Sequence, residues 1–459
     1  MFRRNLLSYL RQWRQKEGRK PLVLRGARQV GKTTAVNLFA GDFRQYIYLN
    51  LEKAADRDIF NHDLSFQKTL EAIYFLKNSS PSEKSTLLFI DEIQNSPAAL
   101  AMLRYFYEEA PEIPVIAAGS LFEVYLDKYG LSFPVGRVEF AYLYPLCFEE
   151  YLIAKGDDSA IQALKTVPMP SYVHARLLDV FNEYVLIGGM PAVVADYVEH
   201  QDPGGLTNLY ESLMVSYTDD AAKYARNSTM FQHIRHAIET APLEAGKRIK
   251  FQGFGNSSYR SREMGEALRT LERAMLLYLL YPVTGTELPL LPDKRKSPRL
   301  LFLDTGLVNY YAGLQERYIG MSDLGRLYRG RLAEHIVGQQ LMAMDSKQHR
   351  KPLFWVREKA GASAELDFIH LYKGLPVPVE VKSGKSGTLR SLHEYMRRVD
   401  FDLAVRLYAG GISLETVTTR YGKTFRLLNL PYFLCGQLDA YLDWVEPLTA
   451  ASFPLSSLY

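Results

Sequence analysis

Short apolar runs of strand length recur through the first third of the chain, at residues 21–24, 87–90, 115–118 and 138–143. These runs are mostly apolar and show little alternation with polar residues, which is typical of parallel strands buried on both faces. The first run precedes a helical pattern at residues 35–40, which ends at Gly41. The pattern predicts an α/β fold class with a parallel sheet.

Beyond the sheet the pattern becomes helical. Between about residues 171 and 245 the period is helical throughout, with a break at residues 187–191. A further helix is predicted at residues 259–275, and two apolar strands follow it at residues 276–281 and 299–303. A helix followed by a two-stranded hairpin is the order of a winged helix.

The last third of the chain predicts a second α/β unit. Residues 364–372 and 377–382 are two apolar strands joined by Lys373 and Gly374, which is a hairpin signal. Residues 329–340 are expected to form a helix upstream of this hairpin.

Composition limits the class of protein. A chain of 459 residues is too long for one hydrophobic core, so several domains are expected. The two cysteines exclude a disulfide framework and a cysteine-based zinc site, which suits a reducing cytoplasm. The start of the chain lacks the apolar core of a secretory signal, and the longest internal apolar run, residues 274–281, is far below the ~20 residues of a membrane span. We expect a cytoplasmic protein without a membrane partner. The net charge of +4 permits nucleic-acid binding without requiring it.

A phosphate-binding motif lies between the first strand and its helix. Its spacing is G-x-x-x-x-G-K-[ST], and the residues are Gly26, Ala27, Arg28, Gln29, Val30, Gly31, Lys32, Thr33 and Thr34. The glycines permit a tight turn whose N–H groups face anionic phosphates. We expect Lys32 to reach the β- and γ-phosphates and Thr33 to bind Mg²⁺. The motif predicts ATP and Mg²⁺ as cofactors.

Acidic and polar residues follow the later strands. Asp91 and Glu92 end the second predicted strand, at the sheet edge where ligands bind, and fit a Mg²⁺ acceptor and the base that orients water. Ser120 follows the third strand and is a candidate sensor of the γ-phosphate, or part of a simple turn. Arg137 precedes the last strand and is a candidate arginine finger, or a solvated cation.

The predicted hairpin between residues 276 and 303 has a basic tip. As a wing it would contact nucleic-acid phosphates, and the alternative is a protein-interaction domain with a solvated loop. The tip residues are Lys294, Arg295, Lys296 and Arg299.

The C-terminal hairpin carries a second set of charged residues. Asp367 and the pair Glu380 and Lys382 have the spacing of a metal-dependent phosphodiesterase, and alternation places residues 380 and 382 on one face of a strand. Glu334 on the upstream helix is a further candidate metal ligand. The alternative is a structural cluster of ion pairs. Glu394 and Lys385 are weaker supporting candidates.

Several motifs together resemble those of prokaryotic AAA+ ATPases that carry a C-terminal domain of unknown function. They are residues 26–34, 89–94, 143–151 and 188–191, while residues 303–307 and 378–384 look like the C-terminal part, which is similar to PD-(D/E)XK restriction-endonuclease-like folds. Ser120 and Arg137 match the family's Gly-Ser and Gly-Arg positions at strand ends. Leu366 stands where such endonucleases often have proline, so the resemblance does not establish cleavage.

The helical periodicity and the resemblance together predict four segments. These are an AAA+ P-loop core at 1–155, a helical lid region at 156–245, a winged-helix-like module at 246–310 and a restriction-endonuclease-like domain at 311–459. Three hypotheses follow. In the first, the chain is an Mg²⁺-dependent ATPase that acts on DNA, with or without cleavage. In the second, it is a nucleotide-gated switch that binds a protein partner through an inert C-terminal domain. In the third, the C-terminal hairpin is purely structural. An oligomer is compatible with each.

Overall fold

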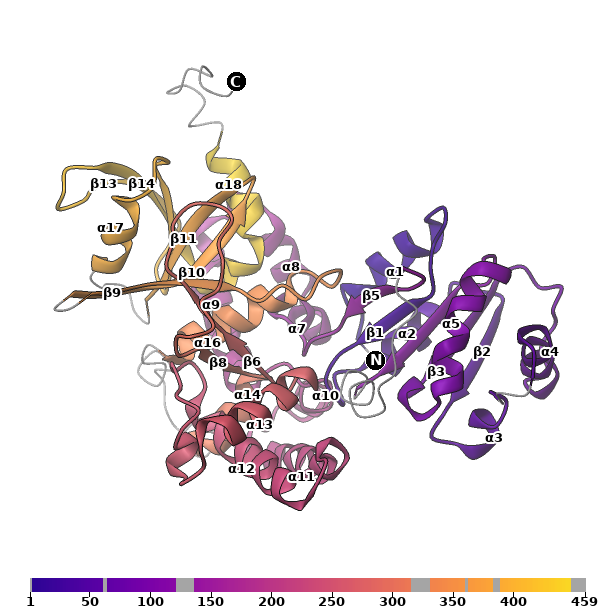
Figure 1. Cartoon of the computed structure of the whole chain (residues 1–459). Coiled ribbons are helices and arrows are strands. Elements are labelled where there is room, and N and C mark those ends of the chain that lie inside the picture. Colours follow the sequence, from indigo (N-terminus) through magenta and orange to yellow (C-terminus); the bar gives the residue numbers. More distant parts are fainter. Residues whose placement is uncertain are drawn as a thin grey trace.

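The computed structural model describes residues 2–60, 64–120, 136–314, 331–359, 362–382 and 389–446. Figure 1 shows the N-terminal sheet on the right, the C-terminal sheet at upper left and a group of helices below. None of the helices within these ranges is both long and apolar enough to cross a membrane.

The N-terminal sheet has five parallel strands in the order β2-β3-β4-β1-β5. Its strands are β1 (Leu22–Arg25), β2 (Gln45–Asn50), β3 (Thr86–Asp91), β4 (Val115–Gly119) and β5 (Glu139–Tyr142). The predicted parallel α/β core is confirmed. Because the strands are parallel, their C-terminal ends share one edge, where Arg25 pairs with Gly119.

Helices cover both faces of this sheet. Leu22 and Leu24 point toward α1 and α2, whereas Val23 belongs to a second apolar cluster with α4 and α5. Successive residues of β1 thus serve opposite layers, as strand geometry requires. The helices are α1 (Leu6–Gln15), α2 (Lys32–Ala40), α3 (Ala54–Arg57), α4 (Phe66–Leu76) and α5 (Pro97–Glu109).

The middle of the chain is helical. The bounds are α7 (Phe148–Lys155), α8 (Asp158–Lys165), α9 (His174–Ile187), α10 (Pro191–His200), α11 (Thr207–Tyr224), α12 (Ser228–Glu244), α13 (Ser261–Arg273) and α14 (Thr305–Tyr311). The break predicted at residues 187–191 separates α9 from α10. α14 packs against α9, α11 and α12.

The hairpin predicted after α13 is present, but its connection is not a free loop. β6 (Leu277–Leu280) pairs antiparallel with β8 (Arg299–Phe302). Between them, β7 (Pro282–Val283) pairs with β9 of the C-terminal sheet. The segment on the N-terminal side of residue 310 therefore shares a sheet with the segment beyond it.

The C-terminal sheet is mixed, with seven strands in the order β13-β14-β12-β11-β10-β9-β7. Besides β7, its strands are β9 (Leu353–Lys359), β10 (Ala362–Tyr372), β11 (Leu375–Val381), β12 (Leu403–Tyr408), β13 (Ser413–Thr418) and β14 (Thr424–Pro431). The helices of this part of the chain are α16 (Arg331–Ala343), α17 (Arg390–Met396) and α18 (Leu438–Val445). β10 and β11 form the predicted antiparallel hairpin. One apolar core runs from α1 and α2 through the helices to this sheet.

Candidate functional site

The phosphate-binding motif forms the loop between β1 and α2. Gln29 and Gly31 have left-handed backbone, with φ of 64° and 91°, so the loop turns sharply before the helix begins. A Cβ on Gly26 would lie 2.3 Å from the carbonyl oxygen of Leu143. Gly26 is thus required by the close approach of the chain after β5, and Gly31 by its φ. The exposed N–H groups of such a turn and of the helix start favour bound anions.

Lys32 is buried inside this loop. Its ammonium donates hydrogen bonds to the carbonyl oxygens of Gly26, at 3.0 Å, and Ala27, at 2.8 Å. Burial lowers the pKa of Lys32 to about 8, and the charges of Glu92 and Asp91 partly oppose this effect. The loop therefore holds a cation beside its N–H groups.

Asp91 links the end of β3 to the loop. The hydroxyl of Thr33 donates to Asp91 Oδ2 at 2.7 Å, and the Tyr48 hydroxyl donates to the same oxygen at 3.2 Å. Burial raises the pKa of Asp91, while these hydrogen bonds act in the opposite direction. A hydroxyl and a carboxylate are hard oxygen ligands, so Thr33 and Asp91 fit a Mg²⁺ ion that keeps most of its waters.

Glu92 lies next to this pair in a left-handed conformation, with φ of 52°. Gln94 Nε2 donates to Glu92 Oε2 at 2.5 Å. Burial raises the pKa of Glu92, which suits a group that accepts a proton from water. Gln94 itself rests on Gly119, where a Cβ would lie 2.2 Å from Gln94 Oε1. Gln94 ends the motif at residues 89–94, but the sequence assigned it no role.

Ser120 and Arg137 lie at opposite ends of the parallel strands. Ser120 follows Gly119, which pairs with Arg25, so it is at the same edge as the loop. Glu139 pairs with Leu22 at the start of β1, so Arg137 precedes the sheet at the other edge and forms an ion pair with Glu108 at 2.7 Å. At ~3.3 Å per residue, β1 separates this edge from the loop by about 10 Å. Arg137 therefore lies away from the phosphate loop of its own chain.

A distant helix contacts the loop. The Arg28 guanidinium forms an ion pair with the buried Asp220 of α11 at 2.6 Å. The Tyr217 hydroxyl donates to the carbonyl oxygen of Arg28 at 3.2 Å. α11 is therefore tied to the loop by one side chain and one backbone group. The sequence spacing gave no signal for these partners.

The N-terminal segment supports the loop from another side. Arg4 donates to the carbonyl oxygens of Val30, at 2.9 Å, and Tyr144, at 2.6 Å, and forms an ion pair with Glu150 at 3.0 Å. Arg4 and Glu150 are both buried.

Asp304 connects the break between α9 and α10 to the C-terminal part. Its Oδ2 accepts from the N–H of Gly189 at 2.7 Å and from Gln339 of α16 at 3.3 Å. A Cβ on Gly188 would lie 2.1 Å from Asp304 Oδ1. Burial raises the pKa of Asp304 to about 6, against several N–H donors that lower it. Pro191, at the end of this break, approaches Gly31 of the phosphate loop.

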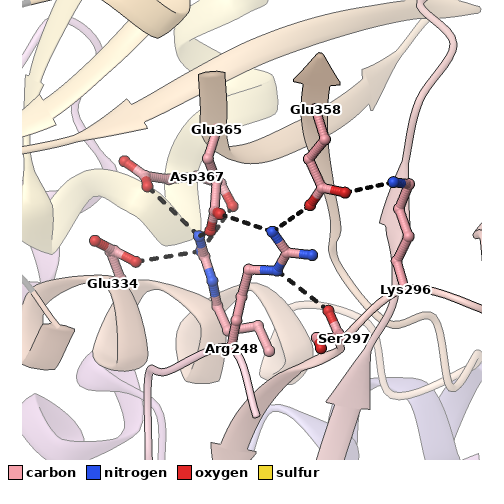
Figure 2. A network of polar contacts seen from close by, with 8 residues as sticks. Arg248, Lys296, Ser297, Glu334, Glu358, Glu365 and Asp367 are labelled. Atoms are coloured by element: carbon pink, nitrogen blue, oxygen red, sulfur yellow. Dashed lines mark hydrogen bonds and ion pairs between the residues drawn. The ribbon is translucent and has the colours of Figure 1, made fainter. Parts of the chain in front are cut away.

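The predicted C-terminal metal centre contains an arginine. Arg299 has 2% of its side chain exposed and pairs with Glu365 at 2.5 Å, Glu334 at 3.3 Å and Asp367 at 3.7 Å. Figure 2 shows these three carboxylates, Glu334, Glu365 and Asp367, pointing toward one another. The expectation that Arg299 contacts nucleic-acid phosphates is wrong, because β8 directs it into the acidic cluster.

Glu380 and Lys382 pair with each other beside this cluster, at 2.5 Å. Asp367 Oδ2 accepts from the N–H of Val381 at 2.8 Å. Burial raises the pKa of Glu380 to about 8 and that of Glu334 to about 7. Across the described part of the chain, no three His, Cys, Asp or Glu side chains are grouped to hold a metal ion. The residues as placed do not form the predicted metal centre, because Glu334 and Asp367 pair with Arg299, which the prediction did not include, and Glu380 pairs with Lys382.

The other basic residues of the predicted wing have acidic partners or lie in solvent. Lys296 pairs with Glu358 at 2.5 Å, and Arg248 pairs with the same carboxylate at 2.7 Å (Figure 2). Arg295 pairs with Asp293 at 2.9 Å, and Lys294 is exposed. Lys385 lies outside the described residues.

Three family models match the chain. Residues 18–152 match the model described as AAA domain, and residues 178–318 and 329–433 match two domains of unknown function, DUF8612 and DUF4143. A search of curated proteins gave no match.

Solved structures similar to the chain include a Walker-type ATPase of Pyrococcus abyssi, with 14% identity over 68% of this chain and 96% of that chain and a TM-score of 0.42. The Aeropyrum pernix ORC2 protein, in ADPNP–ADP complexes, has 12% identity over 68% and 93%, with a TM-score of 0.31. The Thermotoga maritima RuvB Holliday junction branch migration motor has 15% identity over 63% and 90%, with a TM-score of 0.27. Residues 18–152 thus match an AAA domain model and have the strand–loop–helix geometry of a P-loop core.

Proposed function

We propose that the chain binds ATP with Mg²⁺ and hydrolyses it. The observation that carries the proposal is the 2.7 Å hydrogen bond from Thr33 to Asp91, which brings a hydroxyl and a carboxylate together beside the phosphate loop. Thr33 and Asp91 would hold Mg²⁺, which supplies positive charge to the phosphates. Lys32 neutralises phosphate charge, and Glu92 orients and deprotonates the attacking water.

Ser120 is our proposed sensor of the γ-phosphate, because it follows a strand that ends beside the loop. Arg137 serves as a finger only in the site of a second copy of the chain, since it lies at the other edge of its own sheet. This role requires an oligomer.

We propose that nucleotide binding and hydrolysis change the rest of the chain through two sets of contacts. Arg28 moves with the loop and pairs with Asp220, so bound phosphate biases the position of α11. Pro191 and Gly189 lie between the loop and Asp304, whose carboxylate also accepts from Gln339 of α16. A change at the loop would thus act on the C-terminal domain through packed, hydrogen-bonded groups.

We propose nucleic acid as the partner of this switch, bound without cleavage. We do not propose cleavage, because the acidic residues expected to hold a metal ion instead form ion pairs with Arg299 and Lys382. Support for nucleic acid is the excess of arginine on the C-terminal domain, described below.

ATP turnover measured with and without single-stranded and double-stranded DNA tests this function. Magnesium-dependent turnover that changes with DNA, and whose DNA effect fades as salt rises, is expected. Absence of turnover contradicts the ATPase. Turnover that DNA leaves unchanged at low salt contradicts the nucleic-acid coupling and favours a protein partner.

A further inference from the structure

Four arginines surround a single buried glutamate on the C-terminal domain. Glu394 of α17 is within 2.6 Å of Arg398, 3.4 Å of Arg397 and 3.6 Å of Arg420, and it accepts a hydrogen bond from Arg357. These arginines come from β9, from the residues after α17 and from the turn between β13 and β14. Figure 1 shows α17 beside β13 and β14. Chain segments distant in sequence thus bring their guanidiniums to one point.

The group has more positive than negative charge. Four guanidiniums against one carboxylate leave a surplus of three positive charges. Nearby, Asp402 is paired with Arg426 at 3.0 Å, and Lys423 donates to the carbonyl oxygen of Phe401 at 3.1 Å. Asp400 is exposed on the adjoining turn and offsets part of the surplus. In contrast, the cations in the predicted wing mostly face carboxylates of their own.

Solvent reaches this group, and an aromatic ring lies in it. The side chains of Arg420 and Arg397 are 63% and 35% exposed. Tyr421 is 43% exposed, and its ring lies 4.3 Å from the Arg397 guanidinium and 4.7 Å from that of Arg420. The Tyr421 hydroxyl donates to Glu394 at 2.7 Å, which fixes the ring at the surface.

Glu394 holds the arginines in place. Burial alone would raise the pKa of Glu394, but hydrogen bonds from Tyr421 and Arg398 and the charges of the arginines lower it to about 2. The carboxylate is therefore ionised at neutral pH. It holds the arginine side chains in one conformation, so they lose less rotamer freedom when a ligand binds. Glu394, only a weaker supporting candidate for the C-terminal site in the sequence, thus has four arginine partners.

We propose that Arg357, Arg397, Arg398, Arg420 and Tyr421, the arginine surface, bind the phosphate backbone of nucleic acid, with an unpaired base stacked on Tyr421. This inference rests on the proposed function in that it names the surface at which its nucleic-acid partner binds; the ligand is identified from the chemistry of the surface itself. Guanidinium groups match phosphate oxygens bidentately, and several of them together engage successive phosphates of one backbone. An exposed tyrosine among cations is the arrangement that binds single strands through stacking.

The test titrates the full-length chain into a fluorescent 20-nucleotide single strand, and into the matching duplex, at several salt concentrations. The double variant Arg397→Gln/Arg420→Gln is expected to bind the single strand at least about tenfold more weakly and to lower the slope of log K against log salt by about 1.4, from two lost phosphate contacts. Tyr421→Leu is expected to weaken the single strand by about tenfold, and the duplex less.

Arg235→Gln is the matched control. Arg235 is 52% exposed and pairs only with Glu239 among the ion pairs of the described residues, on α12 far along the chain from the arginine surface. It should leave both affinities unchanged. ATP turnover without nucleic acid should be the same in all variants, which shows that they fold.

Two results overturn the proposal. If the wild type binds nucleic acid and the double variant keeps its affinity and salt slope, another surface makes the contact while the proposed function stands. If the wild type binds neither probe but binds poly-glutamate through Arg397 and Arg420, the partner is an acidic protein, and the nucleic-acid part of the proposed function fails with it.

Discussion

Arg28 of the phosphate loop and Asp220 of α11 form an ion pair at 2.6 Å, although 192 residues separate them in the chain. Asp220 is buried and also pairs with Lys223 at 2.8 Å. The pair joins the loop that would hold phosphate to the helical part of the chain. It is one contact by which a bound nucleotide would act outside its own domain.

Replacing Asp220 tests this route. Asp220→Ala removes the carboxylate that pairs with Arg28. The loop is then less ordered before ATP binds, and ordering it costs binding free energy. We expect ATP to bind about fivefold to tenfold more weakly, as measured by calorimetry, because a charge-assisted contact worth ~1 kcal/mol is lost in a partly exposed setting. Asp219→Ala is the control, since Asp219 is the exposed neighbour. Equal affinities in both variants would show that the pair does not order the loop.

The second prediction concerns Arg299, the buried cation among Glu334, Glu365 and Asp367. Arg299→Met removes the charge but keeps an apolar stem. Leaving partly buried carboxylates unpaired should lower the free energy of unfolding by about 3–5 kcal/mol. Urea unfolding measures this change.

Lys294→Met is the control for this loss, because Lys294 is exposed on the same connection. It should change stability by less than about 0.5 kcal/mol. Similar stability of the two variants would mean that Arg299 does not hold the acidic cluster together.

The third prediction is a pH dependence at Glu380. Burial raises its folded-state pKa to about 8, above the ordinary value of 4.5, so between these values the folded state binds a proton that the unfolded state lacks. The resulting stability is complete below pH 4.5 and is lost as the pH rises through 8, with a slope of about 1.4 kcal/mol per pH unit for one proton.

Glu380→Gln mimics the protonated acid and removes this titration. Unfolding free energies of both proteins between pH 5 and 8 should therefore show the wild type losing stability relative to the variant as pH rises. A constant difference across this range would contradict the raised pKa.

The nucleotide site was largely predictable because its parts are local. The motif lies within nine residues, and Asp91 and Glu92 lie where a parallel strand must end. The position of Arg137 could also be predicted from the sequence. Arg137 precedes a parallel strand and the phosphate loop follows one, so the two must lie at opposite ends of the strands.

The C-terminal cluster was only partly predictable. The hairpin places Asp367, Glu380 and Lys382 near one another, as the spacing suggests. Arg299 comes from another part of the chain, and its burial follows from the way β8 packs against α16 and β10. Periodicity within one segment carries no information on such contacts. The arginines around Glu394 also come from separate elements, so no pattern in the sequence indicated that they meet at this residue.

ATP turnover by Glu92→Gln, compared with wild type in Mg²⁺, tests the central claim most directly. Glu92→Gln keeps the loop, Lys32 and the Thr33–Asp91 pair, so it should bind ATP as the wild type does. Loss of the base that activates water should lower turnover by about 10²–10⁴-fold. Turnover at the wild-type rate in this variant would contradict the proposed hydrolytic site.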